Sequence, residues 1–287
     1  MRIDKTLLEP MVKSSIRIDY ALDSEKEVPV GSSKVGGRPD LPTNFSWFYY
    51  GGKSFDGGTE NRPLAFLAQI NCEEASQHDK ESLLPQNGIL YFFYEMATMT
   101  WGFDPQDKGS ARVYYFPGDI SELNRTDFPS DLADEYIIPE MPMTFSSKDE
   151  LPDFEEFIEW HDRFGGKKKF WNQYDAEKSK IVEMLEDDDE AVSKLLGYAN
   201  LIQNGMLLDC ELTTSGTNTG GPKGYTNVTT QQKANCTKWQ LLFQLDSIQA
   251  DGYEMLWGDG GRLYFYINTD DLTQLNFDNC WLILQCY

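Results

Sequence analysis

The sequence of residues 64–71 is Leu-Ala-Phe-Leu-Ala-Gln-Ile-Asn, and that of residues 240–246 is Gln-Leu-Leu-Phe-Gln-Leu-Asp. Each stretch is a short apolar run that holds one internal glutamine, Gln69 or Gln244, and ends at a polar residue. Runs of this length that are bounded by turn-forming residues are typical of buried β-strands. The two stretches therefore predict two interior strands of a sheet, each with a polar side chain inside the core.

Similar aromatic and β-branched runs recur along the chain and predict a mainly antiparallel sheet with a few helices, an α+β protein. The predicted strands are 15–22, 64–70, 88–95, 111–117, 240–246, 262–267 and 280–287. The runs around Leu90 and Leu284 are apolar on both faces, which predicts central positions. Helical spacing predicts a helix at 154–161, with Asp153 and Glu156 as a capping box. It also predicts a second helix at 175–196, or two helices there that meet at the acidic residues 186–190. The polar composition of residues 213–238 predicts a surface loop.

An internal repeat is suggested by the order of these strands. Residues 88–92 are Gly-Ile-Leu-Tyr-Phe and residues 261–265 are Gly-Arg-Leu-Tyr-Phe, and each follows one of the glutamine strands. We therefore expect one compact domain over 1–287 with two similar β units, at about 60–118 and 236–287, packed into one body. A helical, acidic region at about 150–205 would connect them. The alternative is that all buried strands look alike.

The buried glutamines have two interpretations. A buried amide without partners costs about 1 to 3 kcal/mol, so Gln69 and Gln244 are expected to be hydrogen-bonded. They would either bond to backbone across a pseudo-twofold axis or line a cleft shared by the two repeats. Arg38, in a Gly-Gly-Arg-Pro turn, and Asp259, in a glycine-rich loop, are candidate ligand-binding partners for such a cleft.

Several motifs follow one another along the chain: Val-Gly-Gly-Arg-Pro-Asp-Leu-Pro at 35–42, then 63–71, 84–94, 195–203 beginning Leu-Leu-Gly-Tyr, 239–246, and 257–265 beginning Trp-Gly-Asp-Gly-Gly. In this order they resemble the YwqG-like family of bacterial proteins of unknown function. The resemblance covers residues 35–287 and implies the fold rather than a role, because the family has no established reaction. Ser193 stands where the family usually has a histidine, so any chemistry of that histidine is expected to be absent.

The charge of the chain restricts its partners. Lys and Arg number 25 against 47 Asp and Glu, which gives a net charge of −22. Binding to nucleic acid or to an anionic membrane requires a basic surface, so we expect neither, and we expect a basic protein partner instead. Asp187, Asp188 and Asp189 form the densest acidic run and are the predicted contact, although a solvated helix end would have the same sequence.

Residues of the usual catalytic and metal sites are scarce. The chain has two histidines and five cysteines, and the sequence contains no C-x-x-C pair and no H-E-x-x-H or phosphate-loop pattern. His161 lies on an apolar helical stripe, which favours a packed histidine over a ligand. We therefore expect no metal and no cofactor.

Two functional hypotheses follow. The first is a non-catalytic binding protein that engages a basic protein through its acidic surface. The second is an enzyme or small-ligand receptor with Arg38, Gln69, Gln244 and Asp259 in a cleft between the repeats. The first residues show no apolar signal core, and no apolar run is long enough to span a bilayer, so a cytoplasmic location is expected.

Overall fold

The structure, a computed structural model, describes residues 2–22, 28–54, 57–182, 192–250 and 252–287. Its main element is an antiparallel ten-stranded sheet with the strand order β16-β15-β12-β11-β1-β10-β2-β6-β7-β8. In chain order these strands are β1 (Lys13–Tyr20), β2 (Lys34–Val35), β6 (Ala65–Asn71), β7 (Ile89–Tyr94), β8 (Ala111–Phe116), β10 (Met141–Glu150), β11 (Ser193–Leu196), β12 (Trp239–Asp246), β15 (Arg262–Asn268) and β16 (Trp281–Gln285).

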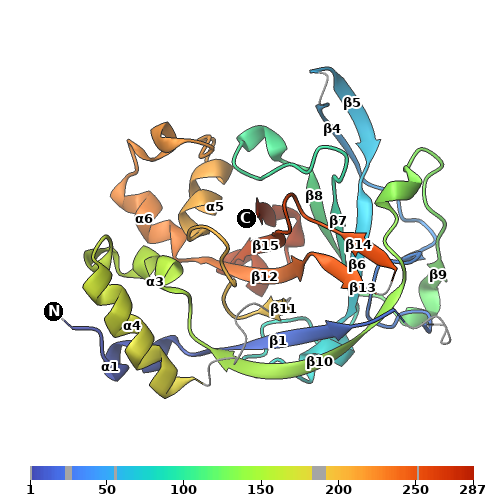
Figure 1. Cartoon of the computed structure of the whole chain (residues 1–287). Helices are drawn as coiled ribbons and strands as arrows, with labels where there is room; N and C mark the ends of the chain where they lie inside the picture. Colours follow the sequence, from blue (N-terminus) through green and yellow to red (C-terminus); the bar gives the residue numbers. More distant parts are fainter. Residues whose placement is uncertain (1, 23–27, 55–56, 183–191, 251) are drawn as a thin grey trace.

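Smaller elements surround this sheet (Figure 1). Three strand pairs lie outside it: β3 (Asp40–Pro42) with β9 (Leu123–Arg125), β4 (Tyr49–Lys53) with β5 (Thr59–Pro63), and β13 (Ile248–Ala250) with β14 (Tyr253–Met255). The α-helices are α1 (Lys5–Leu8), α2 (Cys72–Ser76), α3 (Phe154–Trp160), α4 (Lys168–Ile181), α5 (Leu207–Thr214), α6 (Thr230–Cys236) and α7 (Thr269–Thr273). The predicted α+β class is confirmed, and each predicted strand coincides with a strand of the large sheet.

Side chains alternate between the two faces of each strand, so the sheet separates two hydrophobic clusters. In β7, Leu90 and Phe92 point to the main hydrophobic cluster, whereas Tyr91 and Phe93 point to a second cluster on the opposite face. The sheet curls around the main cluster, so that Phe92 of β7 packs against Phe243 of β12 with ring centroids 4.4 Å apart. The space between the two ends of the sheet is therefore filled by side chains.

The two ends of the sheet, one with β6 and β7 and the other with β12 and β15, have outer faces that are covered by different segments. The segment that contains Leu41 and Phe48 packs over the outer face of β6 and β7. Helix α5, with Leu207 and Cys210, packs over the outer face of β12 and β15. Helices α1, α3 and α4 form a further cluster centred on Phe157, on the side of the molecule where the chain begins (Figure 1).

The two edge strands, β8 and β16, come close to each other, so the sheet is nearly a barrel. The chain before β8 runs along β16, where the carbonyl of Trp101 accepts a hydrogen bond from the Leu284 amide at 3.1 Å. Gly102 permits this approach, because it has φ +80° and a Cβ there would lie 1.9 Å from the Leu282 carbonyl oxygen. Likewise, Phe277 in the chain before β16 packs against Tyr115 of β8, with ring centroids 5.6 Å apart.

This mutual covering corrects the predicted position of one strand. The run around Leu284 was expected in the centre of the sheet because both of its faces are apolar. It forms the edge strand β16, and its residues are buried because the 101–102 segment and α5 cover them.

Three further predictions near the helices are wrong. The helix expected at 175–196 ends at Ile181, and Ser193–Leu196 is strand β11, inserted between β1 and β12. Asp153 makes no capping bond at α3, because its carboxylate bonds to Lys178 and to the Leu201 amide. Residues 213–238 are not a plain loop, since they include α6.

The division into two repeated units and one compact domain stays a prediction.

Among the described residues, no helix combines the length and the apolar character needed to cross a bilayer.

Candidate functional site

Three adjoining cavities form a continuous depression, which we call the front groove. The first, of about 930 Å³, lies between β4 and the segment 98–107. The second, of about 450 Å³, lies between α5 and the segment 219–225, and the third, of about 680 Å³, lies between α3 and α6. Phe103 and Gly220 line both the first and the second cavity, and Glu159 and Leu208 line both the second and the third.

The walls of the groove are joined by specific hydrogen bonds. The Glu159 carboxylate of α3 accepts the amides of Leu207 and Leu208 at 3.2 and 2.9 Å, and so caps the N-terminus of α5. The hydroxyl of Tyr225 donates to the Asp209 carboxylate, which ties the loop after α5 back to the helix. The Thr219 amide donates to the Phe103 carbonyl at 2.8 Å. These bonds fix the groove between three parts of the chain that are distant in sequence.

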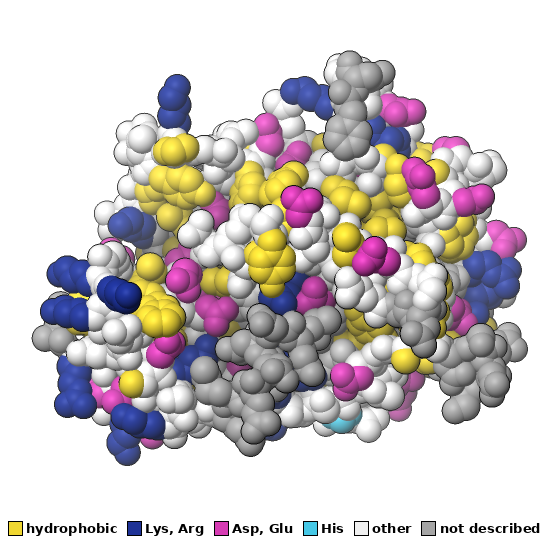
Figure 2. Space-filling view, viewed as in Figure 1, with side chains coloured by type: hydrophobic (Ala, Val, Ile, Leu, Met, Phe, Trp, Pro, Cys, Tyr) yellow, Lys and Arg dark blue, Asp and Glu magenta, His cyan; other side chains and the backbone are white. Residues whose placement is uncertain are grey.

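Aromatic side chains lie along the groove. Trp101 is 43% exposed and Tyr225 is 41% exposed, and Phe103 between them is half-buried. Figure 2 shows hydrophobic side chains on the face between α6 and the β4–β5 hairpin, with Asp and Glu side chains beside them. Exposed aromatic rings with polar neighbours are a common feature of surfaces that bind other molecules.

Carboxylates outnumber cations in the groove. Its acidic lining residues are Asp104, Asp107, Glu155, Glu159, Asp162 and Asp209, whereas its basic lining residues are Lys53 and Lys233. Lys233 is 3.5 Å from Asp162 and is therefore already paired. A concave, acidic surface concentrates negative potential and attracts cations.

Burial changes the acidity of three of these carboxylates. Burial raises the pKa of Glu159 to about 7 against the stabilising effect of its two amide donors, and Asp209 nearby raises it further. Burial likewise raises the pKa of Asp209 to about 6, although its bonds with Tyr225 and Thr219 act in the opposite direction. The pKa of Asp107 is also raised by burial. A cationic group placed in the groove would stabilise the ionised form of each.

The two predicted glutamines lie inside the protein. Gln69 and Gln244 are fully buried, and each accepts a backbone amide and donates to a backbone carbonyl of the neighbouring segment. The partners of Gln69 lie at residues 32 and 40, and those of Gln244 at residues 192 and 200. Each amide is thus satisfied within its own end of the sheet, and the expected bonding across an axis is wrong.

The other two predicted cleft residues lie on the surface. Arg38 is exposed and pairs with Asp127 at 2.8 Å, and Asp259 is exposed in the turn before β15. Neither residue lines the front groove, and neither do Gln69 and Gln244. The structure therefore does not bring the four residues together. Asp187, Asp188 and Asp189 lie outside the described residues.

The groove was not predicted from the sequence, although the sequence of α5 contains an indication of it. Helix α5 begins Leu-Leu-Asp-Cys-Glu-Leu, in which two carboxylates stand inside an apolar segment. Such carboxylates are seldom buried without a partner, so they mark an unusual environment. The other walls come from loops whose approach depends on tertiary structure.

The histidines and cysteines lie elsewhere or are inert. His161 packs against Phe157 with ring centroids 4.8 Å apart, and burial lowers its pKa. Cys236 lines the third cavity, but burial raises the pKa of its thiol to about 12, so the thiol stays protonated. Within the part of the chain that the structure describes, no three His, Cys, Asp or Glu side chains are grouped as metal ligands.

The observations define an α+β protein built on a curled antiparallel sheet with an acidic, aromatic groove on one face. A family model described as Domain of unknown function (DUF1963) matches residues 33–286, and the chain belongs to this family. The comparison with curated proteins finds no match.

Proposed function

We propose that this protein is a non-catalytic, cytoplasmic binding protein whose front groove holds a basic, extended segment of a protein partner. The observation that carries the proposal is the row of acidic lining residues beside exposed Trp101 and Tyr225. Arginine and lysine side chains would pair with these carboxylates, and their stems would pack on the rings. The YwqG-like group within the family, a bacterial origin, and the absence of nucleic-acid and membrane partners belong to the same proposal.

The length of the groove supports an extended partner segment. Its three cavities follow one another from β4 to α6, whereas a compact ligand would need only one of them. Extended segments bind through alternate side chains, so several basic residues would reach the carboxylates in turn. The net charge of −22 would also accelerate the approach of a basic partner.

The environment of the groove favours binding over catalysis. An acid–base reaction needs a group whose proton transfer is available near neutral pH, and imidazole is the usual choice. Neither His78 nor His161 lines the groove. Glu159, whose pKa is near neutral, already bonds to two backbone amides. The alternative, an enzyme or small-ligand receptor built on Arg38, Gln69, Gln244 and Asp259, has less support because these residues lie apart.

A labelled peptide of alternating arginine and serine tests the proposal, with a citrulline peptide of the same length as the uncharged counterpart. We expect the arginine peptide to bind and the citrulline peptide to bind at least about tenfold more weakly. Asp209→Asn and Glu155→Gln should each weaken binding of the arginine peptide several-fold, on the order of 1 kcal/mol. Fluorescence anisotropy gives the dissociation constants.

Asp149→Asn is the matched control, because Asp149 of β10 is half exposed, pairs with Lys80 and lines no part of the groove. It removes the same charge from the protein as Asp209→Asn. If all three variants weaken binding equally, the peptide senses only net charge and the groove proposal is wrong. Equal binding of the arginine and citrulline peptides would also contradict it.

A further inference from the structure

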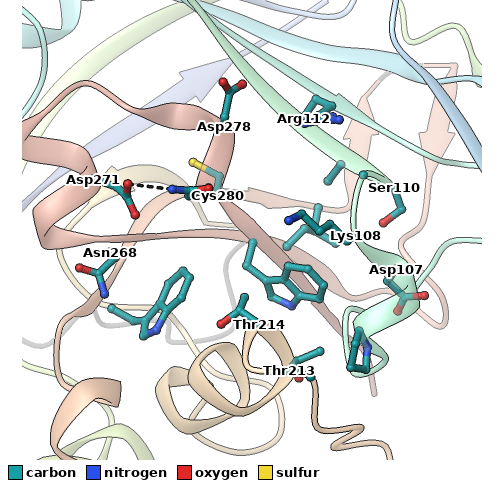
Figure 3. A pocket seen from close by; sticks show the side chains of 18 residues that line it. Asp107, Lys108, Ser110, Arg112, Thr213, Thr214, Asn268, Asp271, Asp278 and Cys280 are labelled. Carbon is teal, nitrogen blue, oxygen red and sulfur yellow. Dashed lines mark hydrogen bonds between the residues drawn. The ribbon is translucent and has the colours of Figure 1, made fainter. Parts of the chain in front are cut away.

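A separate cavity of about 300 Å³ lies between the two edge strands, β8 and β16, where the sheet nearly closes (Figure 3). It does not belong to the front groove, with which it shares only Asp107 of its lining. Trp239 and Trp281 form part of its wall. Their indole N–H groups are engaged elsewhere, with Glu211 at 3.3 Å and with the Gly102 carbonyl at 2.8 Å. The rings therefore offer the cavity an apolar surface, and its volume suits a small molecule.

Arg112 of β8 brings an unpaired cation to this cavity. Its side chain is half-buried, and no hydrogen bond or ion pair joins its guanidinium to another described residue; its closest recorded partner is the Phe48 ring, 5.8 Å away. By contrast, the buried cations Lys34, Lys194 and Arg262 have carboxylates at 2.7, 2.9 and 2.6 Å. A half-buried guanidinium with free donors is a site for a carboxylate or phosphate.

Lys108 adds a second positive charge beside Arg112. It precedes β8, it is exposed, and its ammonium forms no ion pair with a described residue. In Figure 3 its side chain extends across the middle of the cavity. The same segment also contributes Asp107, whose carboxylate accepts the Gly102 amide at 3.0 Å. Two cations and one carboxylate thus lie on this side of the cavity.

The opposite side is negative. Asp271 and Asp278 come from the connection between β15 and β16 (Figure 3). Oδ1 of Asp271 accepts the amides of Asn276 and Asn279 at 2.7 and 2.9 Å, which leaves Oδ2 without a described partner. Asp278 is exposed at the rim and has no ion pair within the described residues. The two signs of charge thus face the same cavity without neutralising each other.

We propose that this cavity at the seam between β8 and β16 binds a small zwitterion of amino-acid size. Its carboxylate would pair with Arg112 and Lys108, its ammonium group with Asp271 and Asp278, and its apolar part would rest on Trp239 and Trp281. Both charges of such a ligand find partners that the protein leaves open, which no ligand of a single charge achieves. The cavity would bind without reacting, because burial and the two aspartates raise the pKa of the Cys280 thiol well above its usual range.

Three probes of matched size test the proposal: phenylalanine, phenylalaninamide, which lacks the carboxylate, and N-acetylphenylalanine, which lacks the ammonium group. Isothermal titration calorimetry should show that the wild-type protein binds phenylalanine at millimolar concentration and each derivative at least about tenfold more weakly. Arg112→Gln should prefer phenylalanine over phenylalaninamide less than the wild-type protein does, and Arg112→Gln combined with Lys108→Gln should bind the two equally. Asp271→Asn should weaken the preference against N-acetylphenylalanine, while its amide oxygen can still accept the side-chain amides of Asn276 and Asn279.

Arg38→Gln is the control, because Arg38 is an exposed arginine that does not line the cavity. It should keep the wild-type preferences, and circular dichroism should show that all variants are folded. No binding of phenylalanine to the wild-type protein overturns the proposal. Equal binding of the three probes, or unchanged preferences in Arg112→Gln, also overturns it.

Discussion

Gln69 in β6 and Gln244 in β12 occupy matching settings at the two ends of the large sheet. Gln69 accepts the Asp40 amide at 2.9 Å and donates to the Ser32 carbonyl at 2.8 Å. Gln244 accepts the Asn200 amide at 2.9 Å and donates to the Val192 carbonyl at 2.7 Å. Both glutamines therefore hold a short neighbouring strand and the turn that follows it.

The surrounding registers also match. Gln69 lies opposite Tyr91 and Gln244 opposite Tyr264, and in both strand pairs the register shifts at the residue two before the glutamine. The two tyrosine hydroxyls donate to the carbonyls of Asp40 and Asn200. The duplication stays a prediction, and a superposition of the two strand sets would test it.

The two ends differ in charge. Gln69 also donates to the Asp40 carboxylate at 2.7 Å, and Arg125 lies 2.6 Å from the same carboxylate. At the other end, the equivalent acceptor is the neutral amide oxygen of Asn200, at 3.3 Å from Gln244. The comparison teaches that the backbone geometry needs an amide at this point, whereas the charge beyond it is free to vary.

Replacing either glutamine with leucine should give the largest effect. The leucine fills a similar volume but leaves a buried amide and carbonyl unpaired, which costs about 3 to 5 kcal/mol of unfolding free energy. Gln69→Leu should cost about 1 kcal/mol more than Gln244→Leu, because it also removes a donor from a carboxylate. Denaturant unfolding measures both values.

Gln240→Leu, on the same strand as Gln244, is the matched control. The side-chain nitrogen of Gln240 is buried without a described partner, so its replacement should be neutral or stabilising. If Gln69→Leu and Gln244→Leu are as mild as this control, the amides do not hold the adjacent strands and the comparison fails.

A second difference between the ends is their response to pH. Glu159, beside the helix that covers β12 and β15, has a pKa of about 7 when folded and an ordinary value of 4.5. Between these pH values the folded protein binds more protons than the unfolded chain. The free energy of unfolding should therefore fall as pH rises from about 4.5 to 7, by about 2 to 3 kcal/mol from this group.

Glu159→Gln isolates that contribution. The amide oxygen of glutamine can still accept the Leu207 and Leu208 amides, but it does not titrate. The variant should lose this part of the pH dependence, while Glu254→Gln, at an exposed site on β14, should keep it. An unchanged slope in Glu159→Gln would show that Glu159 titrates normally.

The strands were predictable because their signals are local. Aromatic and β-branched residues stand in short runs with glycine, proline or asparagine at the ends, and all seven such runs are strands of the large sheet, although β16 lies at its edge and not in its centre. Strand β11 was missed because four residues, Ser193–Leu196, are too few to distinguish a strand from a helical stripe. Its partners, β1 and β12, are distant in sequence, so its identity depends on tertiary structure.

The binding sites were less predictable than the fold. The polar character of Gln69 and Gln244 was recognised, but a buried amide has the same sequence whether it holds a strand or lines a cleft. The sequence around Arg112 does not mark it as a binding residue, because the lack of a carboxylate partner among the described residues is visible only in three dimensions. Cavities at the seam and in the groove arise from loops that cover the opposite edge of the sheet.

The smallest effect is expected from Asp187→Asn, Asp188→Asn and Asp189→Asn together, residues that precede β11 in sequence. Long-range electrostatic attraction acts mainly on the rate of association and is screened within a Debye length of about 8 to 10 Å. The triple replacement should slow association of the arginine peptide about twofold to fivefold at low salt and leave its dissociation rate unchanged. Asp209→Asn should instead accelerate dissociation, because it removes a partner inside the groove. Stopped-flow measurements at low and high salt separate the two rates, and an association rate indifferent to both salt and the triple replacement would exclude the acidic run as a contact.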